Sequence, residues 1–459
     1  MLKINHSLKP HDLLPKLKKF WKLSGEKILL IENEYDPEQG SPVFTVNGKY
    51  TSRGWTDWTQ GFEYGSSILQ FDATGDKQFL DLGRKKTIEN MAGHISHMGV
   101  HDHGFNIVST YGNLLRLIRE GKIPDNQWEK EFYELALKIS GAVQASRWTR
   151  INEGGFIYSF NGPHSLFIDT IRTCRILALS HSLGHYLQGE QDDLISLLGR
   201  LINHLKTTAK YSVYYGENRD KYDIAGRTAH ECIFNITNGD FRCPNTQQGY
   251  SPFSTWTRGL SWAILGFAEE LEYIAELPDD ELSLFGRRIE METIMLKAAK
   301  AVCEFYIQHT PIDGIPYWDT GAPDLDKMGD YLNYPADPYN EFEPVDSSAA
   351  AIAAQGLLRL GHYLEDSNKD IAAHYRQAGL TTLNTLLEEP YVSINPKHHG
   401  LLLHSVYHRP NNWDHIPEGS NIPNGESGMW GDYHMRELVL YVNKLINQEP
   451  YYTFFNCIQ

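Results

Sequence analysis

The stretch Ser347-Ser348-Ala349-Ala350-Ala351-Ile352-Ala353-Ala354 is the part of the sequence that decides the fold. Nearly every side chain in it is small, and small side chains let helices pack closely around a crowded axis. The segment Arg287–Lys300 has helical spacing too, but it carries several charges, which is typical of a helix with one face in solvent. We therefore interpret the first stretch as an inner helix and the second as an outer helix.

Apolar residues recur at helical spacing through most of the chain, whereas convincing alternating patterns for strands are scarce. In Phe71-Asp72-Ala73-Thr74-Gly75-Asp76, Gly75 can end one helix and Asp76 can cap the next. We expect helices near 11–23, 58–73, 77–97, 105–120, 126–147, 164–188, 191–211, 255–277, 287–309, 346–364, 369–388 and 430–447.

About a dozen helices in successive hairpins predict an all-α fold, an (α/α)6 barrel with long loops forming a cleft at one end. The long segments near 211–253, 310–345 and 391–429 are rich in Tyr, Trp, Asn, Asp and Pro. Loops of that length are uncommon unless they are functional. No linker composition interrupts the chain. We predict an N-terminal extension over 1–50 that packs on the barrel, and a catalytic barrel over 51–459.

The formal charge of −16 argues against binding to nucleic acid or to an anionic membrane. An anionic ligand would need a local cluster of Arg, His or Lys. Five cysteines without framework spacing indicate reduced thiols, not disulfides. The N-terminal segment lacks a secretory apolar region, and no run approaches the ~20 apolar residues of a membrane span. We expect a cytoplasmic protein, or a periplasmic one if a signal peptide has been removed.

Two aspartates carry the clearest chemical signal, Asp102 in Val100-His101-Asp102-His103-Gly104-Phe105 and Asp169 in Phe167-Ile168-Asp169-Thr170. Apolar surroundings disfavour a charged carboxylate and raise its pKa, and two carboxyl groups in one cavity push their pKa values apart. That arrangement is typical of sugar-processing enzymes. The alternatives are that Asp102 only caps a helix and that Asp169, inside an apolar helix, pairs with Arg172 or Arg175.

Aromatic residues cluster near the predicted loops, where their faces would stack on sugar rings: Trp55, Trp58, Trp148, Trp256, Trp262, Trp318, Trp413 and Trp430. Any single tryptophan is more often part of a core. It is the grouping near Asp, His and Gln that favours carbohydrate binding.

At these residues the chain resembles the unsaturated glucuronyl hydrolases, a glycoside hydrolase family. The matching motifs occur in family order from about residue 55 to 440. They are Trp58-Thr59-Gln60-Gly61-Phe62, His101-Asp102-His103-Gly104-Phe105, Ile168-Asp169, Gln248-Gly249-Tyr250, Ser254-Thr255-Trp256-Thr257-Arg258-Gly259-Leu260-Ser261-Trp262, Ile315-Pro316-Tyr317-Trp318-Asp319, Asp346-Ser347-Ser348-Ala349-Ala350-Ala351-Ile352 and Trp430-Gly431-Asp432-Tyr433.

The resemblance implies an enzyme that removes a 4,5-unsaturated uronic acid from the non-reducing end of lyase-derived oligosaccharides. Asp169 would protonate C4 and help deliver water to C5, and Asp102 would hold a hydroxyl group and keep the pKa of Asp169 high. The ligand would be a small anionic oligosaccharide. The family positions that bind it correspond to Trp58, His101, Phe160, His230, Gln248, Arg258 and Trp262, and an arginine such as Arg258 could meet the carboxylate with a bidentate fork.

The chain departs from the family pattern in three places. Phe160 stands where relatives usually carry Trp, Gln247 replaces a usual His, and 211–229 resembles an insertion before His230. These changes leave the two aspartates in place and affect the identity of the substrate. Arg258 could instead pair with a carboxylate of an inner helix.

Histidines 94, 97 and 101 fall on one helix face, a spacing that suits zinc or iron, but no second metal-binding cluster accompanies them. We predict no metal and no cofactor.

Asp319, Asp346 and Asp432 are expected to cap inner helices or fix loops around the cleft. Three other functions stay open: a different glycosidase such as a saturated β-glucuronidase, a sugar epimerase on the same barrel, and a catalytically silent sugar-binding protein.

Overall fold

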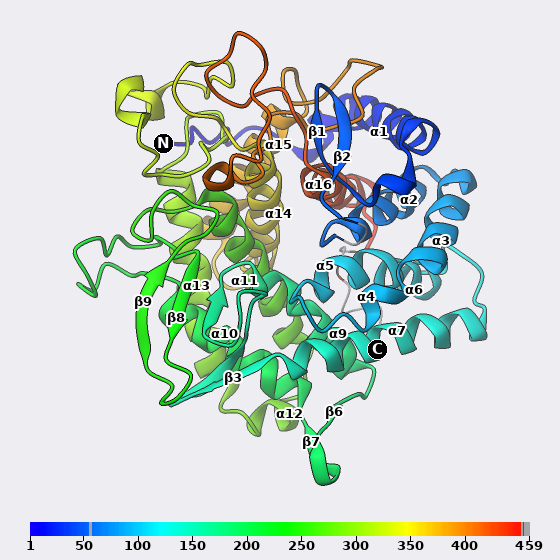
Figure 1. The fold of residues 1–459 in the computed structure, drawn as a ribbon, viewed down its shortest axis with the longest axis vertical. Coiled ribbons are helices and arrows are strands. Elements are labelled where there is room, and N and C mark those ends of the chain that lie inside the picture. Colours follow the sequence, from blue (N-terminus) through cyan, green and yellow to red (C-terminus); the bar gives the residue numbers. More distant parts are fainter. Residues whose placement is uncertain (55–56, 451–452, 454–459) are drawn as a thin grey trace.

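The computed structural model describes residues 1–54, 57–450 and 453. Inner helices form a ring around the axis of the molecule (Figure 1). Each contacts the next in chain order, and the last returns to the first. They are α2 (Gln60–Thr74); α5 (His103–Ile107) with the π-helical turn η3 (Val108–Gly112) and α6 (Asn113–Arg119); α8 (Thr170–Thr173) with α9 (Arg175–Ser182); α11 (Thr257–Glu276); α14 (Ser347–Tyr363); and α16 (Met429–Asn447).

Outer helices cover this ring, each packed against one or two inner helices. They are α1 (Leu14–Glu34), α3 (Lys77–Asn90), α7 (Gln127–Ser146), α10 (Leu197–Tyr211), α13 (Arg288–Gln308) and α15 (Lys369–Leu386), with the short α4 (Ala92–Ile95) and α12 (Asp279–Ser283) between them. The small-residue stretch of α14 is fully buried, as expected of an inner helix. The predicted all-α barrel is confirmed.

Residues 1–50 contribute the helix α1, which packs against α2 and α16. The division of the chain at residue 50 stays a prediction. The turn after α2 has the expected chemistry, because Gly75 is left-handed at φ 73° and Asp76 accepts a hydrogen bond from the Gln78 backbone N–H at 3.0 Å. The carboxylate of Asp346 caps α14 in the same way, by accepting from the backbone of Ser348 and Ala349.

Short antiparallel strands decorate the helical ring. They are β1 (Pro42–Val46) with β2 (Lys49–Ser52), β3 (Trp148–Ile151) with β4 (Gly154–Ile157), β6 (Leu187–Gln188) with β7 (Leu194–Ile195), and β5 (Ser165–Phe167) with β8 (Glu231–Phe234) and β9 (Phe241–Asn245). Figure 1 shows β8 and β9 at the periphery of the molecule and β6–β7 projecting from one end. Strands this short carry almost no periodic signal, which is why the sequence did not indicate them.

The predicted helix over 164–188 is wrong in its first and last parts. Ser165–Phe167 is strand β5, because it pairs with β8, and the chain becomes helical only after Asp169. Beyond Ser182 it leaves the helix again and reaches β6 at Leu187. Other predicted helices have shifted ends: the first continues to Glu34, and the one expected from 191 starts at Leu197.

No helix among the described residues is long and apolar enough to cross a membrane. Cys174, Cys232, Cys243 and Cys303 are free thiols, and Cys457 lies outside the described residues.

Candidate active site

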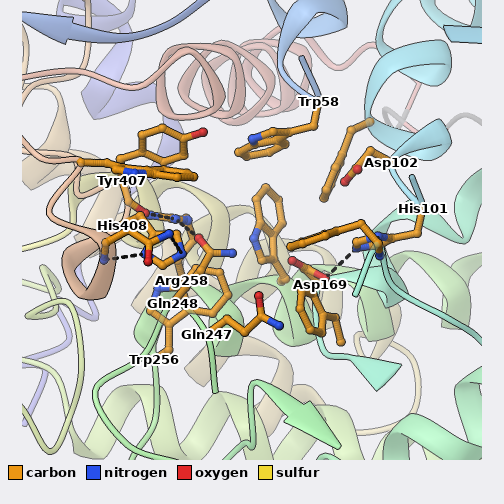
Figure 2. Close-up of a pocket in the computed structure, with 16 residues that line it drawn as sticks. Trp58, His101, Asp102, Asp169, Gln247, Gln248, Trp256, Arg258, Tyr407 and His408 are labelled. Carbon is orange, nitrogen blue, oxygen red and sulfur yellow. Dashed lines mark hydrogen bonds and ion pairs between the residues drawn. The ribbon is translucent and has the colours of Figure 1, made fainter. Parts of the chain in front are cut away.

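A cavity of about 310 Å³ holds most of the residues that the sequence singled out (Figure 2). This volume lies at the lower end of the range found for small-molecule sites. It is lined by Trp58, His101, Asp102, Phe105, Phe160, Phe167, Asp169, Gln247, Gln248, Trp256, Arg258, Trp262, Tyr407, His408, Asn411 and Trp413. Eight of the nine predicted site residues are in this set, and the ninth, His230, lies behind it.

The sheet of β5 and β8 positions Asp169. Phe167 pairs with Glu231, and the next backbone N–H, that of Ile168, donates to the His230 carbonyl at 2.9 Å. Asp169 follows immediately, as the residue before α8. The pairing of two strands distant in sequence therefore sets Asp169 beside His230, at the point where the chain turns into the inner ring.

Asp102 immediately precedes α5, and two motif glycines allow the close packing around it. A Cβ on Gly104 would overlap the Thr173 carbonyl, and one on Gly61 would overlap the backbone of Asn106. The helix that starts after Asp102 thus lies directly against the segment that starts after Asp169. The capping alternative for Asp102 is wrong, because its side chain makes no capping hydrogen bond. Among the described residues, its carboxyl group has no hydrogen-bond or ion-pair partner.

His101 connects the two aspartates. Its Nδ1 accepts the backbone N–H of Phe160 at 3.2 Å, which places the proton of the neutral ring on Nε2. That Nε2 lies 3.2 Å from Oδ1 of Asp169 and donates to it. Burial opposes protonation of His101, but Asp102 and the hydrogen bond to Asp169 outweigh it and raise the pKa of the ring. The predicted alternative that Asp169 pairs with Arg172 or Arg175 is wrong; its partner is His101.

The two carboxyl groups have opposite electrostatic surroundings. Burial raises the pKa of Asp102, and the charge of Asp169 raises it further against the opposing effect of His101. Burial also opposes the charge on Asp169, but the hydrogen bond and charge of His101 outweigh it and lower the pKa of Asp169. The expectation that Asp102 keeps the pKa of Asp169 high is therefore wrong for the free site: the repulsion is present, yet His101 dominates.

Arg258 lines the cavity, but its guanidinium group is already engaged. Its Nη1 donates to Oδ2 of Asp346 at 3.2 Å and to the Val406 carbonyl, and its Nη2 donates to the Tyr407 carbonyl at 2.8 Å and to Oε1 of Gln248 at 2.9 Å. The side chain is 1 % exposed. The free bidentate fork expected from the sequence is therefore absent here, and the alternative of an ion pair with an inner-helix carboxylate is confirmed.

This contact orients Gln248. Because its Oε1 accepts from Arg258, its amide Nε2 is left as the donor available to a ligand. Figure 2 shows Gln248 and Arg258 across the cavity from His101 and Asp102. The wall opposite the catalytic candidates therefore offers a neutral N–H donor with a buried positive charge behind it.

His230 is buried between Phe167 and Trp256, with both ring centroids 4.6 Å away. Its Nδ1 accepts the backbone N–H of Gln247 at 3.0 Å, so the proton of the neutral ring sits on Nε2. Burial lowers the pKa of His230 to about 4, which keeps the ring neutral. Within the described part of the chain, Nε2 has no hydrogen-bond partner, so this histidine fixes the 247–248 backbone and holds one unsatisfied donor.

Aromatic rings form the remaining walls. Trp58 stacks on Trp430 at 5.4 Å, and Trp262, 1 % exposed, packs against Phe105 at 4.9 Å in the floor. Phe160 is 56 % exposed and stacks on His101 at 6.2 Å. Trp55 lies outside the described residues.

The sequence missed half of the lining. Phe105, Phe167 and Trp256 stand inside quoted stretches, Gln247 was noted as a departure from the family pattern, and Trp413 belongs to the tryptophan cluster, so the signal was present but unused. Tyr407, His408 and Asn411 come from the long loop 391–429, which was flagged as functional only by its length. Asp414 holds this loop by accepting the backbone N–H groups of Tyr407 and of His408, the latter at 3.0 Å.

His94 and His101, two of the histidines that suggested a metal, have other side-chain partners, and so does the neighbouring His103. His94 lies 2.6 Å from Oε1 of Gln60 and 3.1 Å from Nδ2 of Asn106, and His103 contacts Ser140 at 2.6 Å. Across the residues that the structure describes, there is no group of three or more His, Cys, Asp or Glu side chains that could hold a metal ion.

The aspartates expected to be structural make structural contacts. Asp319 accepts the backbone N–H of Tyr250 at 2.8 Å, and Asp432 accepts that of Leu402 at 2.8 Å. Together with the cap of Asp346 on α14, this confirms the prediction that these carboxylates fix helix ends and loops near the cavity.

The chain is similar in sequence to known glycoside hydrolases. No family model matches the chain. It is 25 % identical over 397 residues to an unsaturated glucuronyl hydrolase of Formosa agariphila, covering 85 % of this chain and 81 % of that protein. It is 24 % identical over 422 residues to an unsaturated chondroitin disaccharide hydrolase of Streptococcus agalactiae, covering 90 % and 88 %.

Among solved structures, the unsaturated glucuronyl hydrolase of Bacillus sp. GL1 superposes with a TM-score of 0.69 at 22 % identity, covering 94 % of this chain and 98 % of that one. These findings confirm the resemblance that the motifs indicated and the barrel fold, and they support a glycoside hydrolase.

Proposed function

We propose that this glycoside hydrolase removes a 4,5-unsaturated uronic acid from the non-reducing end of an oligosaccharide by hydrating its vinyl ether. The observation that carries the proposal is the pair Asp102 and Asp169, each 8 % exposed and lining one cavity, with His101 hydrogen-bonded to Asp169. Relatives named for unsaturated glucuronyl and chondroitin disaccharide substrates support the choice of ligand.

The reaction needs one proton donor and one water. Asp169 gives its proton to C4, and the resulting cation at C5 takes the oxygen of a water molecule whose proton returns to Asp169. The hemiketal opens to a ketone at C5, and the hemiacetal left at C1 releases the second sugar with its own oxygen. Oδ1 of Asp169 keeps accepting from His101, so Oδ2 carries the proton toward the cavity.

Asp169 must be protonated to start this reaction, although His101 favours its charged form in the free site. An anionic substrate raises the pKa of Asp169 when it binds. Its carboxylate adds negative charge and excludes water, and both effects raise the pKa of a neighbouring carboxyl group. Asp102, whose pKa is raised by burial, can then hold a ring hydroxyl of the substrate.

Gln248 and Arg258 would receive the substrate carboxylate. The amide Nε2 of Gln248 donates a hydrogen bond, and the buried guanidinium behind it supplies positive charge in a region of low dielectric constant. His230 Nε2 is a further donor near Asp169, and Trp58, Phe160 and Trp262 provide apolar faces for the sugar rings.

The test follows ultraviolet absorbance of the conjugated double bond on a panel of lyase-generated unsaturated disaccharides. Wild type should consume at least one member, and Asp169→Asn should lower kcat/KM by about 10²–10⁴-fold, the usual contribution of a general acid–base group. Asp125→Asn is the matched control, because Asp125 is exposed and does not line the cavity. Residual activity of Asp169→Asn near wild type would rule out the mechanism, and no turnover on any member would rule out the reaction.

A further inference from the structure

Arg53 lies at the rim of the active-site cavity, directly after strand β2. Its guanidinium carbon is 5.0 Å from the ring centroid of Trp413 and 5.7 Å from that of Tyr407, both of which line the cavity. Its Nη2 donates to the Trp413 carbonyl at 3.0 Å. Two rings and one carbonyl thus hold this cation in a defined orientation, as in other cation–π contacts.

Arg53 is not neutralised by the protein. Its side chain is exposed, and no carboxylate among the described residues lies within ion-pair distance of it. One of its five N–H donors is used, so a fork of donors stays free. In a chain of net charge −16, an oriented and unpaired arginine is available to an outside anion. Arg258, by contrast, is buried and paired with Asp346.

The direction of the cavity decides which part of a substrate Arg53 would meet. Asp102 and Asp169 are each 8 % exposed, whereas Trp413 is 37 % exposed. The reacting uronate has to lie at the buried carboxyl groups, so the sugar that leaves extends toward an exposed part of the lining. Trp413, which contacts Arg53, is one such part, and Phe160 is another. The loop wall from Tyr407 to Trp413 is braced for this contact by Asp414.

We propose that Arg53 binds an oxyanion on the leaving sugar, a sulfate ester or a carboxylate, and thereby selects substrates that carry a second negative charge. This inference rests on the proposed function and adds a specificity residue to it. A planar guanidinium matches both groups with two parallel N–H donors, which is the geometry that distinguishes arginine from lysine. Because the site is at the rim, its contribution falls as salt is added.

The experiment compares three unsaturated disaccharides with the same uronate and a leaving sugar that is neutral, sulfated or carboxylated. Wild type, Arg53→Gln, Arg53→Lys and the control Arg150→Gln are assayed for kcat/KM at low and at high salt. Arg150 is an exposed arginine on β3 that does not line the cavity, and its substitution makes the same charge change.

Arg53→Gln should lose about tenfold in kcat/KM on a leaving sugar with an oxyanion, the lower end expected for a charge-assisted hydrogen bond, and keep its activity on the neutral one. Arg53→Lys should recover only part of the loss. The sulfated and carboxylated arms identify which source is used. An equal loss on all three substrates would assign Arg53 to support of the loop wall, and no loss on any would also overturn the inference.

Failure of the proposed function is distinguishable from failure of this inference. If wild type consumes none of the three disaccharides, the proposed reaction is wrong. Isothermal titration calorimetry then measures the affinity of wild type and of Arg53→Gln for each disaccharide. Wild type should still bind the sulfated or the carboxylated disaccharide more tightly than the neutral one, and Arg53→Gln should abolish that difference. Equal affinities in wild type would refute the oxyanion site.

Discussion

Replacement of Arg258 with methionine separates the two roles that this arginine could have. In the structure its guanidinium joins four acceptors on three segments: Asp346 at the start of α14, the Val406 and Tyr407 carbonyls, and Gln248. If it acted only as a fork for the substrate, its loss would leave folding unaffected. We expect instead that Arg258→Met destabilises the protein and disables the site together.

The magnitude follows from the burial of the pair. Arg258 and Asp346 are 1 % and 0 % exposed, and removal of one partner of a buried ion pair typically costs about 3–5 kcal/mol. A chain of 459 residues unfolds with an entropy near 1 kcal/mol per kelvin, at ~2.1 cal/mol/K per residue. The expected fall in Tm is therefore about 3–5 °C. It is small on the temperature axis only because the protein is large.

Thermal unfolding and kcat/KM are measured on Arg258→Met, on Asp346→Asn and on the double variant. Asparagine at 346 preserves the cap of α14, because its side-chain oxygen accepts the same backbone N–H groups. The double variant has no buried unpaired charge and should regain most of the lost Tm, while its activity stays low because Gln248 has lost its orientation. A Tm of Arg258→Met equal to that of wild type would refute this reasoning and would indicate that the guanidinium group is available to bind the substrate carboxylate.

Three further outcomes are expected. Gly104→Ala should lower Tm and kcat/KM together, because its Cβ overlaps the Thr173 carbonyl and overpacking costs about 1–3 kcal/mol; unchanged activity in a well-folded variant would show that this approach does not position Asp102. His101→Leu removes the hydrogen bond that lowers the pKa of Asp169, so the protonated acid persists to higher pH and the descending limb of kcat/KM moves upward; a limb that stays or moves down contradicts Asp169 as the acid. Dialysis against a chelator should leave kcat/KM unchanged, since both ring nitrogens of His94 are hydrogen-bonded to side chains.

Helices with long amphipathic patterns and clear caps were predictable from the sequence, and the segment around Asp169 shows why others were not. The apolar run before it fits a helix as well as a strand by periodicity alone. Ser165–Phe167 is extended because it pairs with Glu231–Ile233, more than sixty residues further along the chain. A pairing between such distant segments leaves no local signal.

The identity of the site residues was predictable from the motifs. Their hydrogen-bond and ion-pair partners were not. Eight of the nine candidate residues line the cavity. The sequence could not show, however, that the guanidinium group of Arg258 donates its hydrogen bonds to Asp346 and Gln248. It also could not show that His101 would reverse the expected shift in the pKa of Asp169. Both outcomes depend on distances of about 3 Å between residues that are far apart or on different segments of the chain, and motif spacing does not encode them.

The buried charges at the centre of the barrel explain how a short helix can hold Asp169 still. Arg172, three residues after it on α8, pairs with Glu269 of α11 at 2.8 Å and with Glu437 of α16 at 3.0 Å. Burial opposes the charge on Glu437, yet Arg172 and Arg175 lower its pKa to about 2.

Such pairs add little net stability, because desolvation offsets their attraction, but they accept only one arrangement of their helices. The four-residue α8 is buried and packs against α11, and the ion pairs of Arg172 add to this anchoring. The arginines that the sequence offered as partners for Asp169 therefore act one turn further on. Arg172 fastens α8 to two other inner helices. Among the described residues, His101 is then the cationic partner within hydrogen-bond distance of the Asp169 carboxyl group, which can change its protonation state when an anion binds.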